Sequence, residues 1–310
     1  MTVDISYTPE EIAKILKISR FTVYELIKRG ELTAYKVGRK VRVEAADLEN
    51  YKQRGKGALT APAQASPSFQ QNQPSQDELI ICGQDVVLDV LTRHLDRQMP
   101  QIRFLRNFVG SIDGLIALYR GTANMVTVHL WDGETNQYNV PYVRRFLPGH
   151  KAAIINLVYR PSGFYVAAGN PKNINTWTDL TIPGVRFVNR ERGSGTRVLL
   201  DEQFHKQGID STKVQGYNQE ELSHLAVASR VARGEADVGL GVEKAALQVE
   251  GLDFIPLQQE RYDLVVRKED LSKPHFQAVF SILKSPAFRN EIQGMGGYNI
   301  SQMGDIVAEI

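Results

Sequence analysis

The chain has one cysteine and no long hydrophobic run. Because Cys82 is the only cysteine among 310 residues, an internal disulfide and a cysteine-based zinc site are both excluded. No apolar stretch approaches the roughly 20 residues that span a bilayer. Residues 1–30 carry scattered charges and no apolar signal segment. We therefore expect a soluble, cytoplasmic protein with no membrane partner.

The chain also lacks a strong excess of charge of either sign. Its 37 lysines and arginines against 35 aspartates and glutamates leave a formal net charge of +2. A protein that binds polyanions over its whole surface needs a much larger positive field, so any basic function must be local. The length suits more than one domain, since single domains usually have about 100–200 residues.

Residues 55–77 are rich in Pro, Ser, Gln, Ala and Gly and contain a single aromatic side chain. They show no periodic apolar face, and we interpret them as a flexible linker between residues 1–54 and residues 78–310. In the second part, short apolar runs alternate with helical patterns, as in "ELIICG" followed by "QDVVLDVLTRHLD". This alternation predicts an α/β fold on a mainly parallel sheet. A second α/β unit, from "GVRFVNRERGSGTR" to "EADVGLGV", is inserted in the first.

The first fifty residues show the start and stop signals of two short helices. Thr8-Pro9-Glu10-Glu11 combines a cap residue, a proline at the first helical position and the glutamate of a capping box. Ser19 caps a second helix, which Gly30 ends. Two such helices joined by a tight turn form a helix-turn-helix. The runs "TAYKV" and "KVRVE" then flank a basic turn at residues 38–39, and "AADLENYK" predicts a closing helix.

This segment resembles the excisionase-type branch of the MerR-like winged helix-turn-helix domains, whose pattern it matches from Thr8 to Val43. The resemblance implies binding to double-stranded operator DNA; a small module that binds another protein is the alternative. Recognition helices meet base edges at their start, and basic side chains nearby suit backbone phosphates. The candidate DNA contacts are Ser19, Arg20, Thr22, Tyr24, Lys28, Arg39, Lys40 and Arg42.

Several strand-to-helix turns of residues 78–310 carry Gly or a hydroxyl residue at the helix start, as in Gly110-Ser111 and "GSGT" at residues 193–196. Helix starts bind anions through unpaired N–H groups and the helix dipole. The chain contains no Walker P-loop, no complete dinucleotide fingerprint and no Gly-x-Ser-x-Gly. We therefore expect no catalytic residues and no enzyme activity.

Glu221 and His224 stand three residues apart, a spacing that can present both to a metal ion from one helical face. There is one copy of the pair and no second cluster of ligands. We expect the two side chains to contact a ligand or to belong to a helix-cap network, and we predict neither a metal site nor a bound cofactor.

The runs "GSIDGLIALYRG", "GSGTR" and "ADVGLG" are similar to the periplasmic-binding-protein-like domains found fused to helix-turn-helix units. The resemblance extends from Leu79 to the C-terminus. It implies the two-lobed fold of type II solute-binding proteins, related to molybdate- and tungstate-binding proteins. Lobe one would comprise residues 78–168 and 256–310, and lobe two residues 169–255.

The resemblance also implies where a ligand would bind, since molybdate binders surround their anion with hydroxyl and backbone N–H donors from both lobes. The matching positions are Gln84 or Asp85, Ser111, Ser194, Gly195, Thr196, Gly241, Val242 and Tyr262. Two residues depart from the pattern: an ionised Asp85 would repel a dianion, and Arg197 suits a carboxylate or a phosphate. We expect Arg190 and Arg192 to form surface or interlobe salt bridges.

These observations define a hypothesis: a one-component transcriptional regulator that works as a dimer or higher homo-oligomer and senses a small oxyanion, molybdate or tungstate first. A larger anionic metabolite such as a molybdopterin-type cofactor is the alternative ligand. A cofactor-biosynthesis module tethered to DNA, or a structural nucleoid or phage accessory protein, is the alternative from another functional class.

Overall fold

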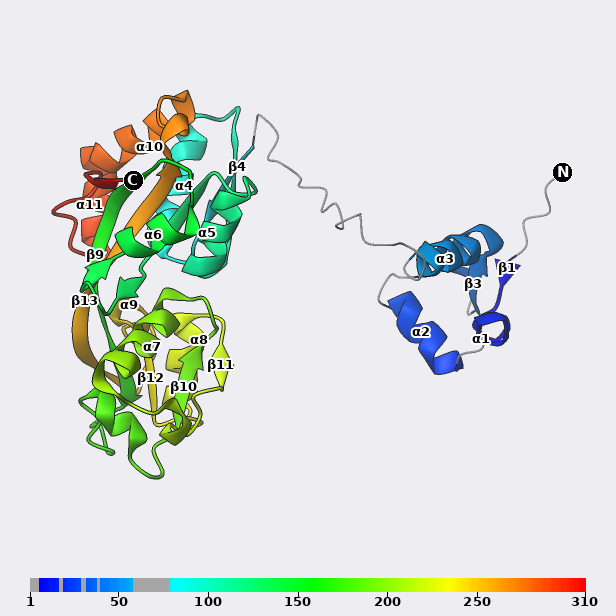
Figure 1. Cartoon of the computed structure of the whole chain (residues 1–310), viewed down its shortest axis with the longest axis horizontal. Coiled ribbons are helices and arrows are strands. Elements are labelled where there is room, and N and C mark those ends of the chain that lie inside the picture. Colours follow the sequence, from blue (N-terminus) through cyan, green and yellow to red (C-terminus); the bar gives the residue numbers. More distant parts are fainter. Residues whose placement is uncertain (1–5, 17–18, 29–31, 38–39, 58–77) are drawn as a thin grey trace. The chain divides into compact units, whose positions relative to one another are not determined.

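The computed structural model describes residues 6–16, 19–28, 32–37, 40–57 and 78–310 (Figure 1). These residues belong to two units, residues 1–70 and residues 71–310. No helix in the described part of the chain is long and apolar enough to cross a membrane.

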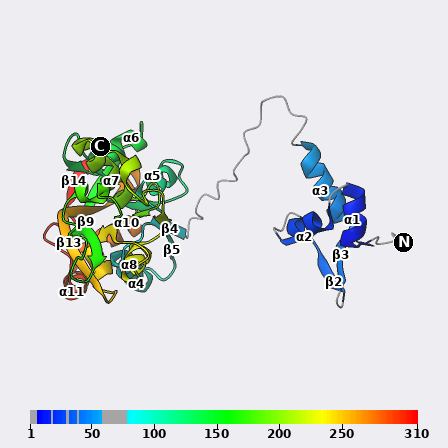
Figure 2. The ribbon, with the colours of Figure 1, turned by 90° about the horizontal axis from the view of Figure 1, so that it is seen from below.

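The N-terminal unit consists of three helices and a small antiparallel sheet. The helices are α1 (Pro9–Leu16), α2 (Arg20–Lys28) and α3 (Ala45–Gly57). The sheet has the order β1-β3-β2, with β1 at Ser6–Tyr7, β3 at Lys40–Glu44 and β2 at Tyr35–Val37. Figure 2 shows the β2–β3 hairpin projecting from the helices. The predicted winged helix-turn-helix is confirmed.

Local capping explains where these helices begin. Thr8 N donates to Glu11 Oε2 at 2.8 Å and Glu11 N donates to Thr8 Oγ1 at 3.3 Å, so the predicted capping box is present. Ser19 Oγ accepts a hydrogen bond from Thr22 N at 3.1 Å. Helix α3 continues to Gly57, into the stretch predicted as linker, and residues 58–77 of that prediction lie outside the described residues.

One mixed sheet runs through the C-terminal unit, in the order β11-β10-β12-β9-β13-β6-β4-β5, with β14 (Ile306–Glu309) also paired to β9. Each lobe contributes three strands paired in parallel. In lobe one these are β4 (Glu78–Cys82), β5 (Arg103–Asn107) and β6 (Met125–Val128). In lobe two they are β10 (Phe187–Arg190), β11 (Glu220–Glu221) and β12 (Val238–Val242). The predicted α/β fold is confirmed, whereas the prediction of a mainly parallel sheet is wrong, because β9 and β13 pair antiparallel with each other and with their neighbours β12 and β6.

Two long antiparallel strands join the lobes (Figure 1). The chain leaves lobe one along β9 (Ala152–Ala167) and returns along β13 (Leu252–Arg267). Register shifts occur between Pro256 and Gln258 and between Tyr262 and Asp263. They bracket the crossing between the lobes, because β13 residues after the second shift pack in the core of lobe one.

Helices cover both faces of the sheet in each lobe, because successive strand residues point to opposite faces. Ile81 and Ile155 face one core of lobe one, whereas their neighbours Cys82 and Ile154 face the other. The first core is covered by α4 (Val86–Gln98), α10 (Pro274–Lys284) and α11 (Pro286–Gly294), and the second by α5 (Ser111–Tyr119) and α6 (Val140–Phe146). In lobe two, α7 (Gly195–Gln207) lies on one face, and α8 (His224–Ala232) and α9 (Glu243–Ala246) lie on the other.

A short hairpin of lobe one packs against lobe two. It is formed by β7 (Trp131–Asp132) and β8 (Gln137–Tyr138). The Trp131 ring lies in the apolar core of lobe two with Leu200 and Phe204 of α7. The lobes therefore share packed surface in addition to the two crossing strands.

Candidate anion-binding cleft

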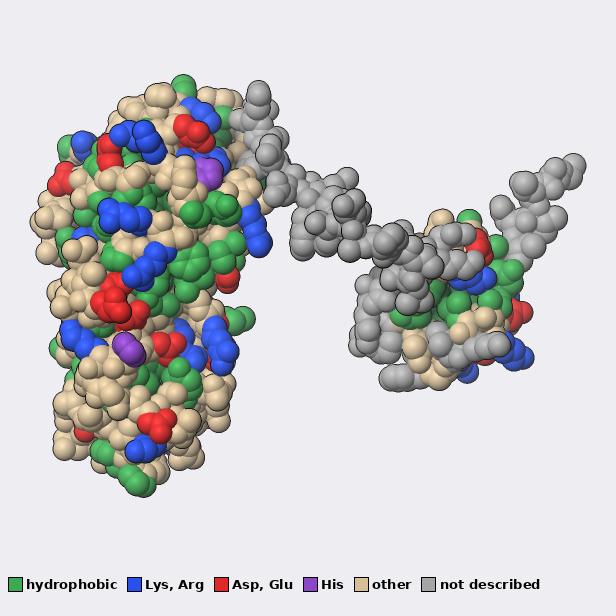
Figure 3. All heavy atoms as spheres, viewed as in Figure 1, with side chains coloured by type: hydrophobic (Ala, Val, Ile, Leu, Met, Phe, Trp, Pro, Cys, Tyr) green, Lys and Arg blue, Asp and Glu red, His purple; other side chains and the backbone are tan. Residues whose placement is uncertain are grey.

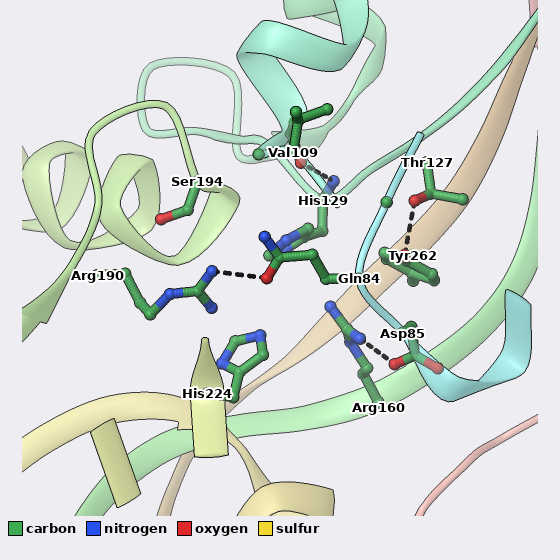
Figure 4. A pocket seen from close by; sticks show the side chains of 13 residues that line it. Gln84, Asp85, Val109, Thr127, His129, Arg160, Arg190, Ser194, His224 and Tyr262 are labelled. Atoms are coloured by element: carbon green, nitrogen blue, oxygen red, sulfur yellow. Dashed lines mark hydrogen bonds and ion pairs between the residues drawn. The ribbon is translucent and has the colours of Figure 1, made fainter. Parts of the chain in front are cut away.

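A cavity between the lobes collects the starts of four helices, α4, α5, α7 and α8 (Figure 4). Its empty volume is about 330 Å³, including the space open to solvent. The lining residues are Gly83, Gln84, Asp85, Val109, Gly110, Ser111, Thr127, His129, Arg160, Arg190, Ser194, His224 and Tyr262. Six of the predicted ligand contacts are therefore brought together here: Gln84, Asp85, Ser111, Ser194, His224 and Tyr262.

The lobes are in direct contact beside this cavity. Ile112 N of lobe one donates to Gly193 O of lobe two at 3.0 Å. Gly110 makes the approach possible, since a Cβ atom there would lie 2.8 Å from Gly193 O and 2.9 Å from Ser194 N. Gly195 is equally close to the other lobe, because its Cβ would lie 2.6 Å from Nδ1 of His129. Gly110 therefore lets two backbones meet without a side chain between them, and Gly195 leaves room for the His129 ring.

Arg190 of β10 and Gln84 of lobe one form a hydrogen bond across the cleft (Figure 4). Arg190 Nη2 donates to Gln84 Oε1 at 3.0 Å, and Nε donates to Glu191 Oε2 at 2.7 Å. Arg190 is only 3 % exposed, so it is part of a buried interlobe network. The salt bridge of Arg190 is to Glu191 of its own lobe, and its interlobe partner Gln84 is uncharged; Arg192 forms a surface salt bridge with Glu220 at 3.7 Å, as expected.

Arg160 of β9 is a site residue that our sequence reasoning missed. Its Nε donates to Glu260 Oε1 at 2.7 Å, and its Nη1 pairs with Asp85 Oδ2. Burial would by itself raise the pKa of Glu260, but Arg160, followed by His129, outweighs that effect and lowers it to about 2. The available signal was that Arg160 is the one charged residue of β9, because buried arginines are retained when they are paired.

Asp85 is engaged by three partners and does not present a free carboxylate to the cavity. Its Oδ1 accepts from Val87 N at 2.8 Å, as the N-cap of α4, and from the Tyr298 hydroxyl at 2.9 Å. Its Oδ2 pairs with Arg160. The repulsion expected between Asp85 and a dianion is therefore reduced by a buried arginine.

The hydroxyl groups around the cavity differ in what they can still donate. Thr127 Oγ1 donates to Cys82 O at 3.1 Å and lies 2.6 Å from the Tyr262 hydroxyl, so Tyr262 must be the donor in that second contact. Ser194 donates to Glu191 O at 2.9 Å and caps α7. Ser111 Oγ accepts from His129 N at 3.4 Å, which leaves its proton available for a ligand. Burial raises the pKa of Tyr262 to about 12, so this hydroxyl is neutral near pH 7.

Two histidines complete the cavity wall. His129 Nδ1 lies 2.9 Å from Glu260 Oε2. His224 is the first residue of α8, and its Nδ1 is buried and has no hydrogen-bond partner among the described residues. Burial, with the positive charges of Arg190 and Arg160 and the nearby His129, lowers the pKa of His224 well below 6.5. This imidazole is therefore neutral near pH 7.

The structure does not bring the other predicted contacts to this cavity. Arg197 pairs with Asp201 and Glu220 at 3.1 Å each and lies over the Tyr217 ring, so it does not line the site. Glu221 pairs with Arg230 at 3.3 Å. The remaining residues of the prediction also stay outside the lining: Gly195 and Thr196 within the start of α7, Gly241 against the Tyr165 ring, and Val242, which borders a neighbouring cavity.

The predicted DNA contacts on α2 are exposed. Arg20, Thr22 and Tyr24 all face solvent, with the Arg20 guanidinium 2.8 Å from Glu10. Ser19 is used as the helix cap, and Arg42 is half-buried on β3. Arg39 and the side chains of Lys28 and Lys40 lie outside the described residues. Over the face of the C-terminal unit drawn in Figure 3, basic and acidic side chains are interspersed.

Residues 92–284 match the family described as the PBP superfamily domain, and residues 6–56 match the helix-turn-helix domain. The chain belongs to the PBP superfamily and carries a helix-turn-helix domain at its N-terminus, a combination that defines a DNA-binding regulator with a ligand-binding domain. It is 42 % identical over 306 residues to the uncharacterized protein YvgK of Bacillus subtilis, with 98 % of both chains covered.

Two further similarities concern parts of the chain. Over 87 residues, 27 % of this chain and 30 % of the relative, it is 40 % identical to the molybdate-binding protein ModA of Mycobacterium tuberculosis. Among solved structures, a phosphate ABC transporter substrate-binding protein from Clostridium perfringens with bound phosphate is similar with a TM-score of 0.52 and 14 % identity. That similarity covers 71 % of this chain and 98 % of the other, and it concerns the fold.

Proposed function

We propose that this chain is a one-component transcriptional regulator that binds operator DNA through residues 1–54 and a small tetrahedral oxyanion, molybdate or tungstate first, in the interlobe cleft. In this proposal the protein is a cytoplasmic dimer or higher homo-oligomer, and the cleft performs no chemistry. The observation that carries the proposal is a small cavity with hydrogen-bond donors from both lobes and no unengaged carboxylate on its wall.

The donors of the cavity suit an anion that has lost all its protons. The hydroxyl of Ser111 is free to donate, and no partner for Nη1 of Arg190 is found within the described residues. Both oxygens of Asp85 are occupied, so the cavity offers no carboxylate acceptor to a protonated ion such as hydrogenphosphate. Molybdate, tungstate and sulfate need only donors. The similarity to the molybdate-binding protein ModA supports the first two.

Ligand binding would act on the regulator by favouring lobe contact. An ion between Ser111 of lobe one and Arg190 of lobe two contacts both lobes only when they are close, so it stabilises the closed arrangement over an open one. Coupling of this kind typically amounts to about 1–3 kcal/mol between two sites. That free energy would be available to change the affinity for DNA.

Isothermal titration of the full chain with molybdate, tungstate, sulfate and phosphate tests the proposal. We expect molybdate and tungstate to bind with a stoichiometry of one per chain and phosphate to bind at least about tenfold more weakly, which corresponds to about 1.4 kcal/mol. A gel-shift assay with operator DNA should then change when the bound ion is added. An absence of heat with all four ions would refute the oxyanion proposal.

A larger anionic metabolite is the second candidate, because a wider cavity adjoins the first. Its empty volume is about 630 Å³, it shares Gln84, Asp85 and His224 with the inner cavity, and it is also lined by Lys244 and Tyr298. A molybdopterin-type ligand could place its phosphate in the inner cavity and its rings in the outer one. Such a ligand would account for a titration in which none of the four inorganic ions binds.

Gly110→Ala should weaken ligand binding without weakening the fold. The added Cβ would lie 2.8 Å from a backbone oxygen of the opposite lobe, so the lobes must separate to accept it. We expect a loss of about tenfold in oxyanion affinity, or about 1.4 kcal/mol, and an unchanged melting temperature of the free protein. Gly294→Ala is the matched control, because that helical glycine has open space around it. Equal affinities in the two variants would mean that ligand binding does not need this contact.

A further inference from the structure

The charges around the inner cavity do not balance a dianion. The carboxylates of Asp85, Glu260 and Glu191 contact the guanidinium groups of Arg160 and Arg190, so three negative charges face two positive ones. A bound molybdate would add two further negative charges at a buried position. Burying uncompensated charge is costly. The helix starts supply neutral donors, and a group that can gain a proton would supply the positive charge that the two arginines do not.

Two imidazoles line the cavity, and their surroundings differ. A proton on Nδ1 of His129 would face Glu260 Oε2 at 2.9 Å and would neutralise that carboxylate. Nδ1 of His224 is buried and has no partner within the described part of the chain. His224 also lines both the inner and the outer cavity, at the start of α8. A proton on this ring would add charge beside the ligand.

We propose that the cleft binds its oxyanion together with one proton, which is taken from solvent and carried by the His224 imidazole. This inference rests on the oxyanion-binding function proposed above. The charged groups that share the two cavities with His224 are Arg190 of β10, Arg160 of β9, His129 after β6, Asp85 before α4, Asp89 of α4 and Lys244 of α9. In the empty cleft the two arginines disfavour a protonated ring; a dianion between them reverses the sign of the local field.

The linkage between proton and ligand has a definite direction. In the free protein, burial and then Arg190 lower the pKa of His224 well below 6.5, so the ring is neutral near pH 7. The bound dianion raises that pKa again, and the complex then holds one proton more than the free protein. Affinity must therefore fall as pH rises, by up to about tenfold per pH unit above the pKa of the complex.

Calorimetric titration of the full chain with molybdate, in two buffers that differ in their enthalpy of ionisation, measures the proton uptake directly. Near pH 7 we expect about one proton per bound ion. Perrhenate, a tetrahedral oxyanion with a single charge, should bind with little or no proton uptake. Proton uptake near zero with molybdate would overturn the inference, and this measurement requires no variant.

Substitutions of single histidines show which residue carries the proton that is taken up with the ion. His224→Asn should remove the proton uptake and flatten the pH dependence of the molybdate affinity. His150→Asn, at an exposed histidine outside the cleft, should leave both unchanged. If His129→Asn removes the uptake and His224→Asn does not, the proton is on His129 and the assignment is wrong. An absence of binding by every oxyanion at every pH would instead refute the proposed function, and with it this inference.

Discussion

Arg190→Gln should lower oxyanion affinity by about 100-fold, the larger of the two effects on binding that we predict for single substitutions in the cleft. The guanidinium is 3 % exposed, hydrogen bonds to Gln84 of the opposite lobe and lines the cavity. A glutamine removes both the charge and the interlobe hydrogen bond. Hydrogen bonds to charged groups contribute about 1.5–3 kcal/mol, which corresponds to about 10- to 100-fold in affinity.

The matched control is Arg192→Gln, two residues further along the chain, just after β10. Arg192 is exposed, lies 3.7 Å from Glu220 and does not line the cavity. Titration calorimetry of the two variants with molybdate compares a buried and an exposed arginine of the same segment. If Arg190→Gln binds as tightly as Arg192→Gln, the ligand does not contact Arg190, and the cleft as described here is not the oxyanion site.

Arg160→Met should destabilise the C-terminal unit by about 3–5 kcal/mol, because it leaves two buried carboxylates without a counter-ion. Asp85 and Glu260 both pair with this guanidinium. The double substitution Arg160→Met with Glu260→Gln should recover part of the lost stability, since it removes one of the uncompensated charges. Urea denaturation of the three proteins, followed through the tryptophan fluorescence of the unit, provides the free energies of unfolding.

The ion pair of Arg160 and Glu260 also predicts how the stability of the protein changes in acid. With a pKa of about 2 against an ordinary value of 4.5, Glu260 stabilises the folded protein above about pH 4.5, and this contribution is lost as pH falls from there towards 2. In Arg160→Met the carboxylate keeps its burial and loses its counter-ion, so its pKa should rise above 4.5. Mild acid should then stabilise the variant relative to the parent. A stability difference that stays constant between about pH 4 and pH 7 would contradict this account.

Local sequence signals predicted the elements well and the site only in part. The capping box at Thr8 and the Ser19 cap depend on side chains within three residues of each other, and both are present. The helix start at Ser194 was visible for the same reason, whereas α5 begins at Ser111 after Gly110, without a side-chain cap. These helix starts meet at one cavity because the crossing strands bring the two lobes together. Local sequence pattern does not contain this arrangement, and the family resemblance implied it.

Pairing between distant residues was not visible in the sequence. Arg197 lies in the Gly-Ser-Gly-Thr-Arg run and was the natural candidate for an anion contact, yet Asp201 and Glu220 engage it outside the cavity. Arg160 stands in a strand with no motif around it, and it holds Asp85 and Glu260, 75 and 100 residues away. An arginine can face a ligand only if no carboxylate of the folded protein already engages it. The tertiary fold decides which arginines are engaged.

The cavity lies close to β9 and β13, the two strands that cross between the lobes. Arg160 and Glu260 are register partners in the β9–β13 ladder, so the ion pair that borders the cavity lies on the two strands that join the lobes. A rotation that moves the cavity wall by a small amount moves the far ends of the lobes by much more, in proportion to their distance from the rotation axis. In the proposed function, an ion of a few atoms that closes the cleft would therefore move the far ends of the lobes further than it moves the cavity wall.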